Sequence, residues 1–351
     1  MISSSGKHYA NLDHIRALAA FMVFSWHFLP PAARVTIPLP PFSLFAEGHT
    51  GVALFMTLSG YLFAKILNGK RIDYPKFIYN RILRLLPLLV LVVLIVGVIK
   101  HLKGLDLWPY AKGVATSFLG QGGLPNGGWS VVIEFHFYLI LPLLLWLDRT
   151  HKFFLPLLII IMLLLRAMIR SNYGEVQELA YHSLLGRMDQ FVLGIAAFHW
   201  RSHIVGRHGL ASAAFVTLAV FYHLFDRAGG FYGLPSYPSP GIVWVFIPTI
   251  EAVTYCILIA WYAESFEFKP NRFLWLIGKA GAYSYSIYLL HFFFFPKMSR
   301  AAIKLGLPTE NFYVGLTCAA FFFLCMIPVG HVSYKLIEEP FLRFRKHYIR
   351  E

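Results

Sequence analysis

About ten stretches of this chain are apolar and long enough to cross a lipid bilayer, and no other feature limits the possible folds as strongly. A transmembrane helix needs roughly 20 mostly apolar residues. The stretches therefore predict an all-α, polytopic bundle of transmembrane helices in one domain covering residues 1–351. The expected spans are 12–30, 50–68, 84–101, 129–147, 153–170, 188–201, 209–226, 241–262, 274–296 and 311–334.

The composition agrees with a protein surrounded by membrane lipid. Hydrophobic residues make up 58% of the 351 residues and charged residues only 14%, whereas soluble domains carry about 25% charged residues. The formal net charge is +14, but the basic residues lie in short loops between apolar stretches, which favours topology signals over nucleic-acid binding. The three cysteines, Cys256, Cys318 and Cys325, all lie inside apolar stretches. We therefore expect no structural disulfide and no metal site.

The distribution of Lys and Arg predicts that both termini are cytoplasmic. With ten spans, most basic residues fall on the side that holds the N-terminus, as expected for cytoplasmic loops. The loop with Lys297, Arg300 and Lys304 is an exception to this rule. The N-terminus has no signal-peptide pattern, so the first apolar stretch is expected to remain as a helix.

Arg16 and His27 in the first expected helix are the strongest candidates for function. Ionisable side chains inside a membrane helix cost several kcal/mol and need a partner or a role. Eleven residues are close to three whole turns, so the two side chains share a face about 16 Å apart along the axis. A cation could hold an anionic ligand at the cytoplasmic end, while an imidazole further in takes a proton from a hydroxyl. The alternative is that Arg16 reaches the interface and His27 bonds a neighbouring helix.

Three more charged residues extend this pattern. Arg81 and Arg84 are three residues apart and share a helical face, from which guanidinium groups can chelate phosphates. Simple anchoring at a helix start is the alternative. Glu134 lies one turn inside an expected span, at a depth that His27 could share. We therefore expect it to orient the imidazole of His27, or else to form a structural ion pair.

Five further residues are expected to support the site. Ser59 follows small residues that allow close helix contact, and Trp129 could anchor the membrane interface. Tyr288 and His291 share a face and could line a cavity, although satisfied polar packing explains them as well. Asp13 completes the set beside Arg16.

In their order and spacing these segments resemble the membrane-bound acyltransferase-3 family, which includes bacterial surface-polysaccharide O-acetylases. The resemblance runs from about residue 12 to residue 342. Its motifs are Leu12-Asp13-x-x-Arg16-Ala17 with His27, Leu58-Ser59-Gly60-Tyr61, Arg81-x-x-Arg84, Trp129-Ser130-x-x-x-Glu134-x-x-Phe137-Tyr138, Tyr283 to His291, and Glu338-Glu339-Pro340-Phe341.

The resemblance implies a stand-alone enzyme that moves an acyl group, usually acetyl, from cytoplasmic acyl-CoA to a hydroxyl of a carbohydrate or glycolipid. It implies that His27 and Arg16 are the essential pair and that Arg81 and Arg84 bind the donor. It also implies a bacterial inner (plasma) membrane location. No fused extracytoplasmic domain is expected, because the chain ends soon after the last span.

Two other functions remain open at this point. A proton-coupled secondary transporter or a lipid-linked glycan flippase could use His27 and Glu134 as a proton relay, although inverted repeats with broken helices are not evident. A non-catalytic membrane scaffold is the third alternative. The sequence leaves undetermined the acceptor, the acyl chain, the oligomeric state, and whether transfer is direct or proceeds through an acyl-histidine.

Overall fold

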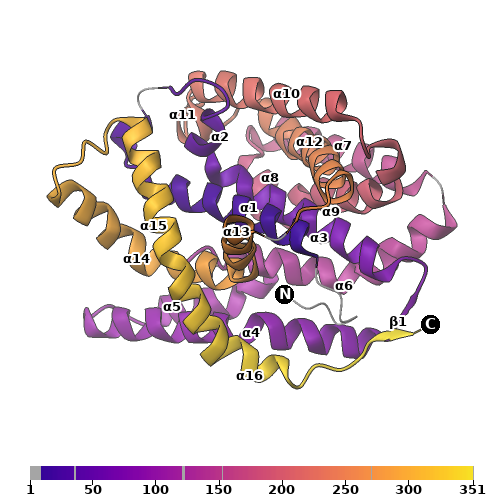
Figure 1. Ribbon diagram of the computed structural model, residues 1–351, viewed down its shortest axis with the longest axis horizontal. Coiled ribbons are helices and arrows are strands. Elements are labelled where there is room, and N and C mark those ends of the chain that lie inside the picture. Colours follow the sequence, from indigo (N-terminus) through magenta and orange to yellow (C-terminus); the bar gives the residue numbers. More distant parts are fainter. Residues whose placement is uncertain (1–8, 35–36, 121–122, 152, 270, 351) are drawn as a thin grey trace.

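The structure is a computed structural model that describes residues 9–34, 37–120, 123–151, 153–269 and 271–350. It is almost entirely helical, with one pair of two-residue strands (Figure 1). The α-helices are α1 (Ala10–Phe28), α2 (Ser43–Ala46), α3 (Gly51–Leu67), α4 (Tyr74–Leu102), α5 (Trp108–Thr116), α6 (Trp129–Thr150), α7 (Phe154–Tyr173), α8 (Gln177–His182), α9 (Leu184–His199), α10 (His208–Arg227), α11 (Gly230–Gly233), α12 (Val243–Ser265), α13 (Arg272–Ala282), α14 (Ser284–Lys304), α15 (Phe312–Ser333) and α16 (Glu339–Leu342). The antiparallel strands are β1 (Arg71–Ile72) and β2 (Ile349–Arg350). Short 3₁₀ turns lie at 31–34, 48–50, 117–119 and 201–203, and a π turn joins α15 to α16.

The prediction of an all-α polytopic membrane protein is confirmed. Seven helical segments in the described part of the chain are long and apolar enough to cross a membrane. They are Gly48–Leu67, Tyr74–Leu102, Trp129–Thr150, Phe154–Tyr173, His208–Arg227, Val243–Ser265 and Phe312–Leu342. Helices α1, α9 and α14 match the other expected stretches but fall outside these seven. A total of ten spans therefore stays a prediction.

One expected span is wrong as a single helix. The stretch 274–296 is divided into α13 and α14 at Tyr283, whose backbone (φ −97°, ψ 9°) leaves the helical conformation. Near this break α13 packs closely on α1. A Cβ atom added at Gly281 would lie only 1.7 Å from the carbonyl oxygen of Asp13. The apolar pattern alone contains no residue that marks the break.

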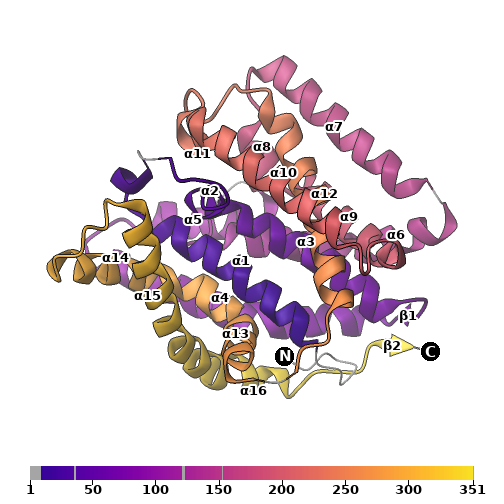
Figure 2. The same ribbon diagram turned by 45° about the horizontal axis from the view of Figure 1, so that its top comes forward.

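Helices α1, α3 and α9 form the interior of the bundle. In Figure 2, α1 crosses the middle of the molecule and α7 lies at its periphery, and most residues of α1 and α9 are buried. Glycines bring α3 and α9 into close contact, as expected from the small residues around Ser59. A Cβ atom at Gly60 would lie 2.1 Å from the carbonyl oxygen of Phe191, and one at Gly194 would lie 2.1 Å from that of Thr57. Because other helices surround them, helices such as α1 and α9 need not be as apolar as helices that face lipid.

A buried ion pair ties α7 to α9 and α12. Both guanidinium Nη atoms of Arg166 donate to the Asp189 carboxylate at 2.7 Å, and both side chains have no exposed area. Arg166 also donates to the backbone oxygens of Val245 and Gly186. The hydrogen bonds of Arg166 and Asp189 all join neighbouring helices, so we assign this ion pair a structural role.

The start of α1 and the C-terminal strand lie at the same end of the bundle. Tyr9, which precedes α1, and Tyr348, which precedes β2, line one end of the same cavity. This proximity agrees with the expectation that both termini share one side of the membrane. That this side is cytoplasmic stays a prediction.

Candidate active site

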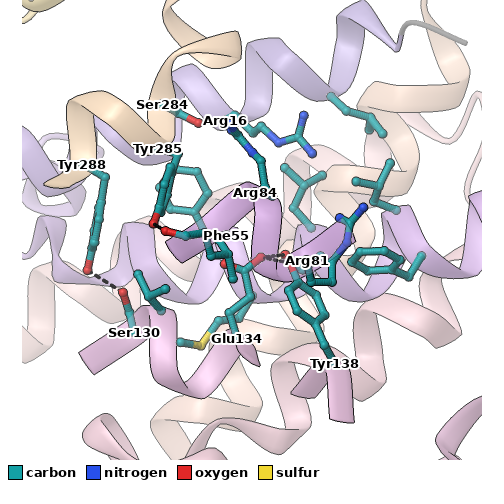
Figure 3. A pocket seen from close by; sticks show the side chains of 18 of the residues that line it. Arg16, Phe55, Arg81, Arg84, Ser130, Glu134, Tyr138, Ser284, Tyr285 and Tyr288 are labelled. Carbon is teal, nitrogen blue, oxygen red and sulfur yellow. Dashed lines mark hydrogen bonds between the residues drawn. The ribbon is translucent and has the colours of Figure 1, made fainter. Parts of the chain in front are cut away.

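A cavity of about 170 Å³ runs between α1, α3, α4, α6 and α14 and is closed on one side by the C-terminal tail. Its wall is apolar along α3, where Val52, Phe55 and Met56 face it, and polar along the other helices. Figure 3 shows three arginines toward one end, Ser130 and Tyr288 toward the other, and Glu134 between them. The other polar lining residues are Tyr9, Asp13, Ser59, Tyr138, Ser284, Tyr285, Arg345 and Tyr348.

The basic end contains all three arginines that the sequence singled out. Arg16 donates to the Asp13 carboxylate at 2.7 Å, one turn back on α1. Arg84 pairs with Glu338 of the π turn. The Arg81 guanidinium lies 5.3–6.0 Å from the centres of four aromatic rings, those of Phe63, Phe77, Tyr138 and Tyr348. The three cations therefore come together from α1 and α4, as the prediction of a shared donor face requires.

Glu134 stands in the middle of the cavity, but the expected contact with His27 is wrong. Its carboxylate accepts hydrogen bonds from the hydroxyl of Ser59, at 3.3 Å, and from that of Tyr138. Among the described residues these are its hydrogen-bond partners, and neither is a histidine. Helix α6 directs Glu134 toward α3 and not toward the C-terminal half of α1, so this carboxylate cannot fix the tautomer of His27 directly.

Ser130 and Tyr288 close the end of the cavity opposite the arginines. Ser130 Oγ donates to Tyr288 Oη at 2.8 Å, and Tyr288 Oη donates to the Gly127 carbonyl at 3.1 Å. Gly127 has φ +73°, and a Cβ atom there would lie 2.9 Å from Tyr288 Oη. Glycine is therefore required for this close approach. The tyrosine and the start of α6 together form a partition.

His27 and His291 lie outside the cavity lining, and the His291 ring centre is 6.1 Å from that of Tyr288. Their rings are 5.0 Å apart, and His291 Nε2 lies 3.3 Å from His27 Nδ1. Phe292 packs edge-on against His27 with its ring centre at 4.5 Å. His291 is almost fully buried and His27 is half-buried. The expectation that His291 lines the cavity is not met, whereas Tyr288 does line it.

Backbone carbonyls determine which nitrogen of each ring carries the proton. His27 Nδ1 lies 2.8 Å from the Val23 oxygen, and His291 Nδ1 lies 2.6 Å from the Tyr288 oxygen. A carbonyl oxygen can only accept, so each neutral ring is protonated on Nδ1. His291 Nε2 is then an acceptor that faces the Nδ1–H group of His27. In this tautomer His27 carries its basic lone pair on Nε2.

The remaining predicted residues support the walls of the site. Trp129 packs against Tyr181 and His182, with ring centres 5.0 and 4.7 Å away, and it is outside the cavity lining. Asp13 and Ser59 both line the cavity. Sequence reasoning missed Arg345 and Tyr285 as lining residues and Glu338 as the partner of Arg84. Glu338 belongs to a motif that carried the family resemblance, and this was the available signal.

Comparison with known proteins identifies the family of this chain. The family described as an acyltransferase domain matches residues 9–330. A curated relative, the peptidoglycan O-acetyltransferase OatA of Listeria monocytogenes, is 25% identical over 375 aligned positions, which cover 96% of this chain and 56% of the relative. The chain thus spans about half the length of the relative that it matches. No solved structure matches this chain.

Proposed function

This chain belongs to the acyltransferase domain family, and we propose that it is a membrane O-acyltransferase that moves an acetyl group from acetyl-CoA to a carbohydrate or glycolipid hydroxyl. The observation that carries the proposal is the arrangement along α1. Arg16 opens into a cavity with three further arginines, and His27 lies about 16 Å further along the same helix, in contact with a second histidine.

The basic end of the cavity is suited to the phosphates of the donor. Guanidinium groups bind phosphate oxygens through paired, charge-assisted hydrogen bonds. Arg16, Arg81 and Arg84 would hold these phosphates, and the pantetheine arm would extend along the apolar wall of α3. The thioester then arrives at the partition made by Ser130 and Tyr288, which must open for it to reach His27.

His27 is proposed as the general base. Its Nε2 takes the proton of the acceptor hydroxyl while the oxygen attacks the thioester carbonyl. The C–O bond forms, the C–S bond breaks, and the proton passes from the imidazolium to the leaving thiolate to give CoA. The Val23 carbonyl, at 2.8 Å, and His291 Nε2, at 3.3 Å, share the His27 Nδ1–H group and so stabilise the imidazolium, the part that a carboxylate plays in serine hydrolases. An acyl-histidine intermediate on the same Nε2 is equally compatible with this geometry.

The acceptor class is proposed from the activity named for the curated relative OatA. OatA is a peptidoglycan O-acetyltransferase, so a polymeric or lipid-linked carbohydrate at a bacterial plasma membrane is the corresponding class for this chain. The rival function, a proton-coupled transporter or glycan flippase, has less support. A relay needs His27 and Glu134 to exchange protons, but the carboxylate is bonded to Ser59 and Tyr138 instead.

Mass spectrometry of cell-surface glycans tests the proposal. Cells lacking the protein would be complemented with the wild type, with His27→Ala, or with the control His101→Ala, an exposed histidine near the end of α4. We expect O-acetylated glycans with the wild type and the control only. Equal acetylation with His27→Ala would refute the proposal. Cleavage of acetyl-CoA by the purified protein separates a transferase from a transporter, which would leave the thioester intact.

A further inference from the structure

The C-terminal tail returns to the beginning of α4 and is held there by backbone bonds. Strand β2 pairs with β1. The Asn80 side chain donates to the Lys346 carbonyl at 2.7 Å and accepts from the Lys346 amide at 2.9 Å. The Asp73 amide donates to the Tyr348 carbonyl at 2.8 Å, and the Tyr348 ring is fully buried against Phe77. Figure 1 shows this yellow tail running beneath α4 to the strand pair. The tail is therefore an ordered strap.

This strap carries Arg345 into the basic end of the cavity. Arg345 lies one residue before the doubly bonded Lys346, and it lines the cavity together with Arg81 and Arg84. Burial lowers the pKa of the Arg345 guanidinium to about 10, and the nearby charges of Arg81 and Arg84 add to this effect. The fold thus brings a fourth cation close to two others, at an electrostatic cost.

Two of the four arginines have no carboxylate partner among the described residues. Four arginines and two carboxylates line the cavity. Asp13 is bonded to Arg16, and Glu338 behind the wall is bonded to Arg84. Glu134 accepts from two hydroxyls. Arg81 and Arg345 are left over, and the Nε atom of each is buried without a hydrogen-bond partner. Half-buried cations that lack a carboxylate partner and repel one another favour an anion between them.

We propose that Arg345 and Arg81 form a binding site for a phosphate or diphosphate group, closed by the C-terminal strap. Two guanidinium forks contributed by separate segments, α4 and the tail, match an anion with several oxygens better than a single carboxylate. The ligand is the phosphate end of a soluble nucleotide-bearing molecule. Identifying it with the acyl donor rests on the proposed function, whereas the anion site itself does not.

The test compares Arg345→Ala with Arg343→Ala in the purified full-length chain. Arg343 lies two residues earlier on the same tail, is exposed, and is not part of the cavity lining, so it is a matched control for charge. Binding of inorganic pyrophosphate and of CoA would be measured by calorimetry. Loss of a bidentate charged contact should weaken both about tenfold or more in Arg345→Ala, and leave Arg343→Ala within about twofold of the wild type.

Thermal unfolding separates a binding role from a structural one. Without ligand, Arg345→Ala should melt at the wild-type temperature or above it, because the substitution removes a repelled cation. With pyrophosphate, the wild type should gain stability and Arg345→Ala should gain almost none. A variant that melts well below the wild type without ligand, and still binds pyrophosphate equally, would overturn the site.

Two further outcomes define the ligand and the relation to catalysis. If only nanodiscs containing phosphatidate, and neither soluble phosphate compound, stabilise the wild type through Arg345, then the anion is a lipid headgroup and the assignment to a nucleotide is overturned. Pyrophosphate and CoA binding that depends on Arg345 in a protein without transferase activity would support this site and reject the proposed function. If Arg345→Ala transfers the acetyl group with an unchanged KM for acetyl-CoA, the proposed function would be supported and this anion site rejected.

Discussion

His291 Nε2 lies 3.3 Å from His27 Nδ1, and the Nδ1–H group of each ring donates to a backbone carbonyl, that of Val23 or Tyr288. A histidine therefore stands where the sequence analysis expected the carboxylate of Glu134. This exchange changes which substitutions should stop the reaction and which should only slow it.

Replacing His291 should lower turnover without weakening the binding of acetyl-CoA. In His291→Phe the ring remains among its aromatic neighbours, Phe24 and Phe292, but the second acceptor that shares the imidazolium Nδ1–H of His27 with the Val23 carbonyl is gone. Loss of one charge-assisted hydrogen bond, roughly 1.5–3 kcal/mol, predicts a fall in kcat of about 10- to 100-fold. The KM for acetyl-CoA should stay unchanged. His291→Gln, whose amide oxygen can accept, should recover part of the loss. A rise in KM as large as the fall in kcat would contradict a role limited to positioning.

Replacing Glu134 distinguishes the two assignments directly. Glu134→Gln retains an oxygen that accepts from Ser59 and Tyr138, so we expect kcat to fall less than about tenfold. If Glu134 oriented His27, loss of its charge should cost about 10⁴-fold, as in the corresponding change in serine proteases. Steady-state transfer by the purified variant gives the answer.

Weakening the partition should uncouple thioester cleavage from transfer. Tyr288→Phe removes the hydrogen bonds to Ser130 and to the Gly127 carbonyl. At about 1 kcal/mol each, their combined loss should admit water more often and raise the ratio of acetyl-CoA hydrolysis to transfer by up to about 30-fold. Ser130→Ala should have a similar effect, and the double variant should add little. An unchanged ratio in both single variants would show that the partition does not control access.

Close contact between α3 and α9 should be essential for folding. A Cβ atom at Gly60 would overlap the Phe191 carbonyl, so Gly60→Ala should destabilise the bundle by about 3 kcal/mol. Gly113 in α5 has no atom within 4 Å of such a Cβ atom, and Gly113→Ala should be neutral or stabilising by about 1 kcal/mol. Thermal unfolding in detergent compares the two, and equal melting temperatures would contradict the packing described here.

Local spacing predicted those parts of the site that lie on one helix. Helical periodicity placed Arg81 and Arg84 on one face, and both line the cavity. The small residues around Ser59 indicated the close helix contact that the structure shows. The shared face of Arg16 and His27 stays a prediction. The partner of His27 could not be found in this way, because two helices that cross a membrane at equal depth can direct their side chains to different neighbours. Glu134 faces α3, whereas His291 of α14 faces α1.

The parts that the sequence did not predict depend on contacts between distant segments. The break at Tyr283 accompanies the approach of Gly281 to the backbone of α1, which no local pattern signals. The place of Arg345 depends on Asn80, 266 residues from its bonding partner Lys346. A short polar tail has no periodicity that would reveal such a pairing.

The most direct test of the whole account separates donor binding from acyl transfer in His27→Ala. Binding of CoA and transfer from labelled acetyl-CoA to the acceptor fraction would be measured on the same purified protein. The account predicts CoA affinity within about twofold of the wild type, because His27 lies outside the cavity, and a loss of transfer of at least about 100-fold. Wild-type transfer by His27→Ala would contradict the central claim that this imidazole performs the chemistry.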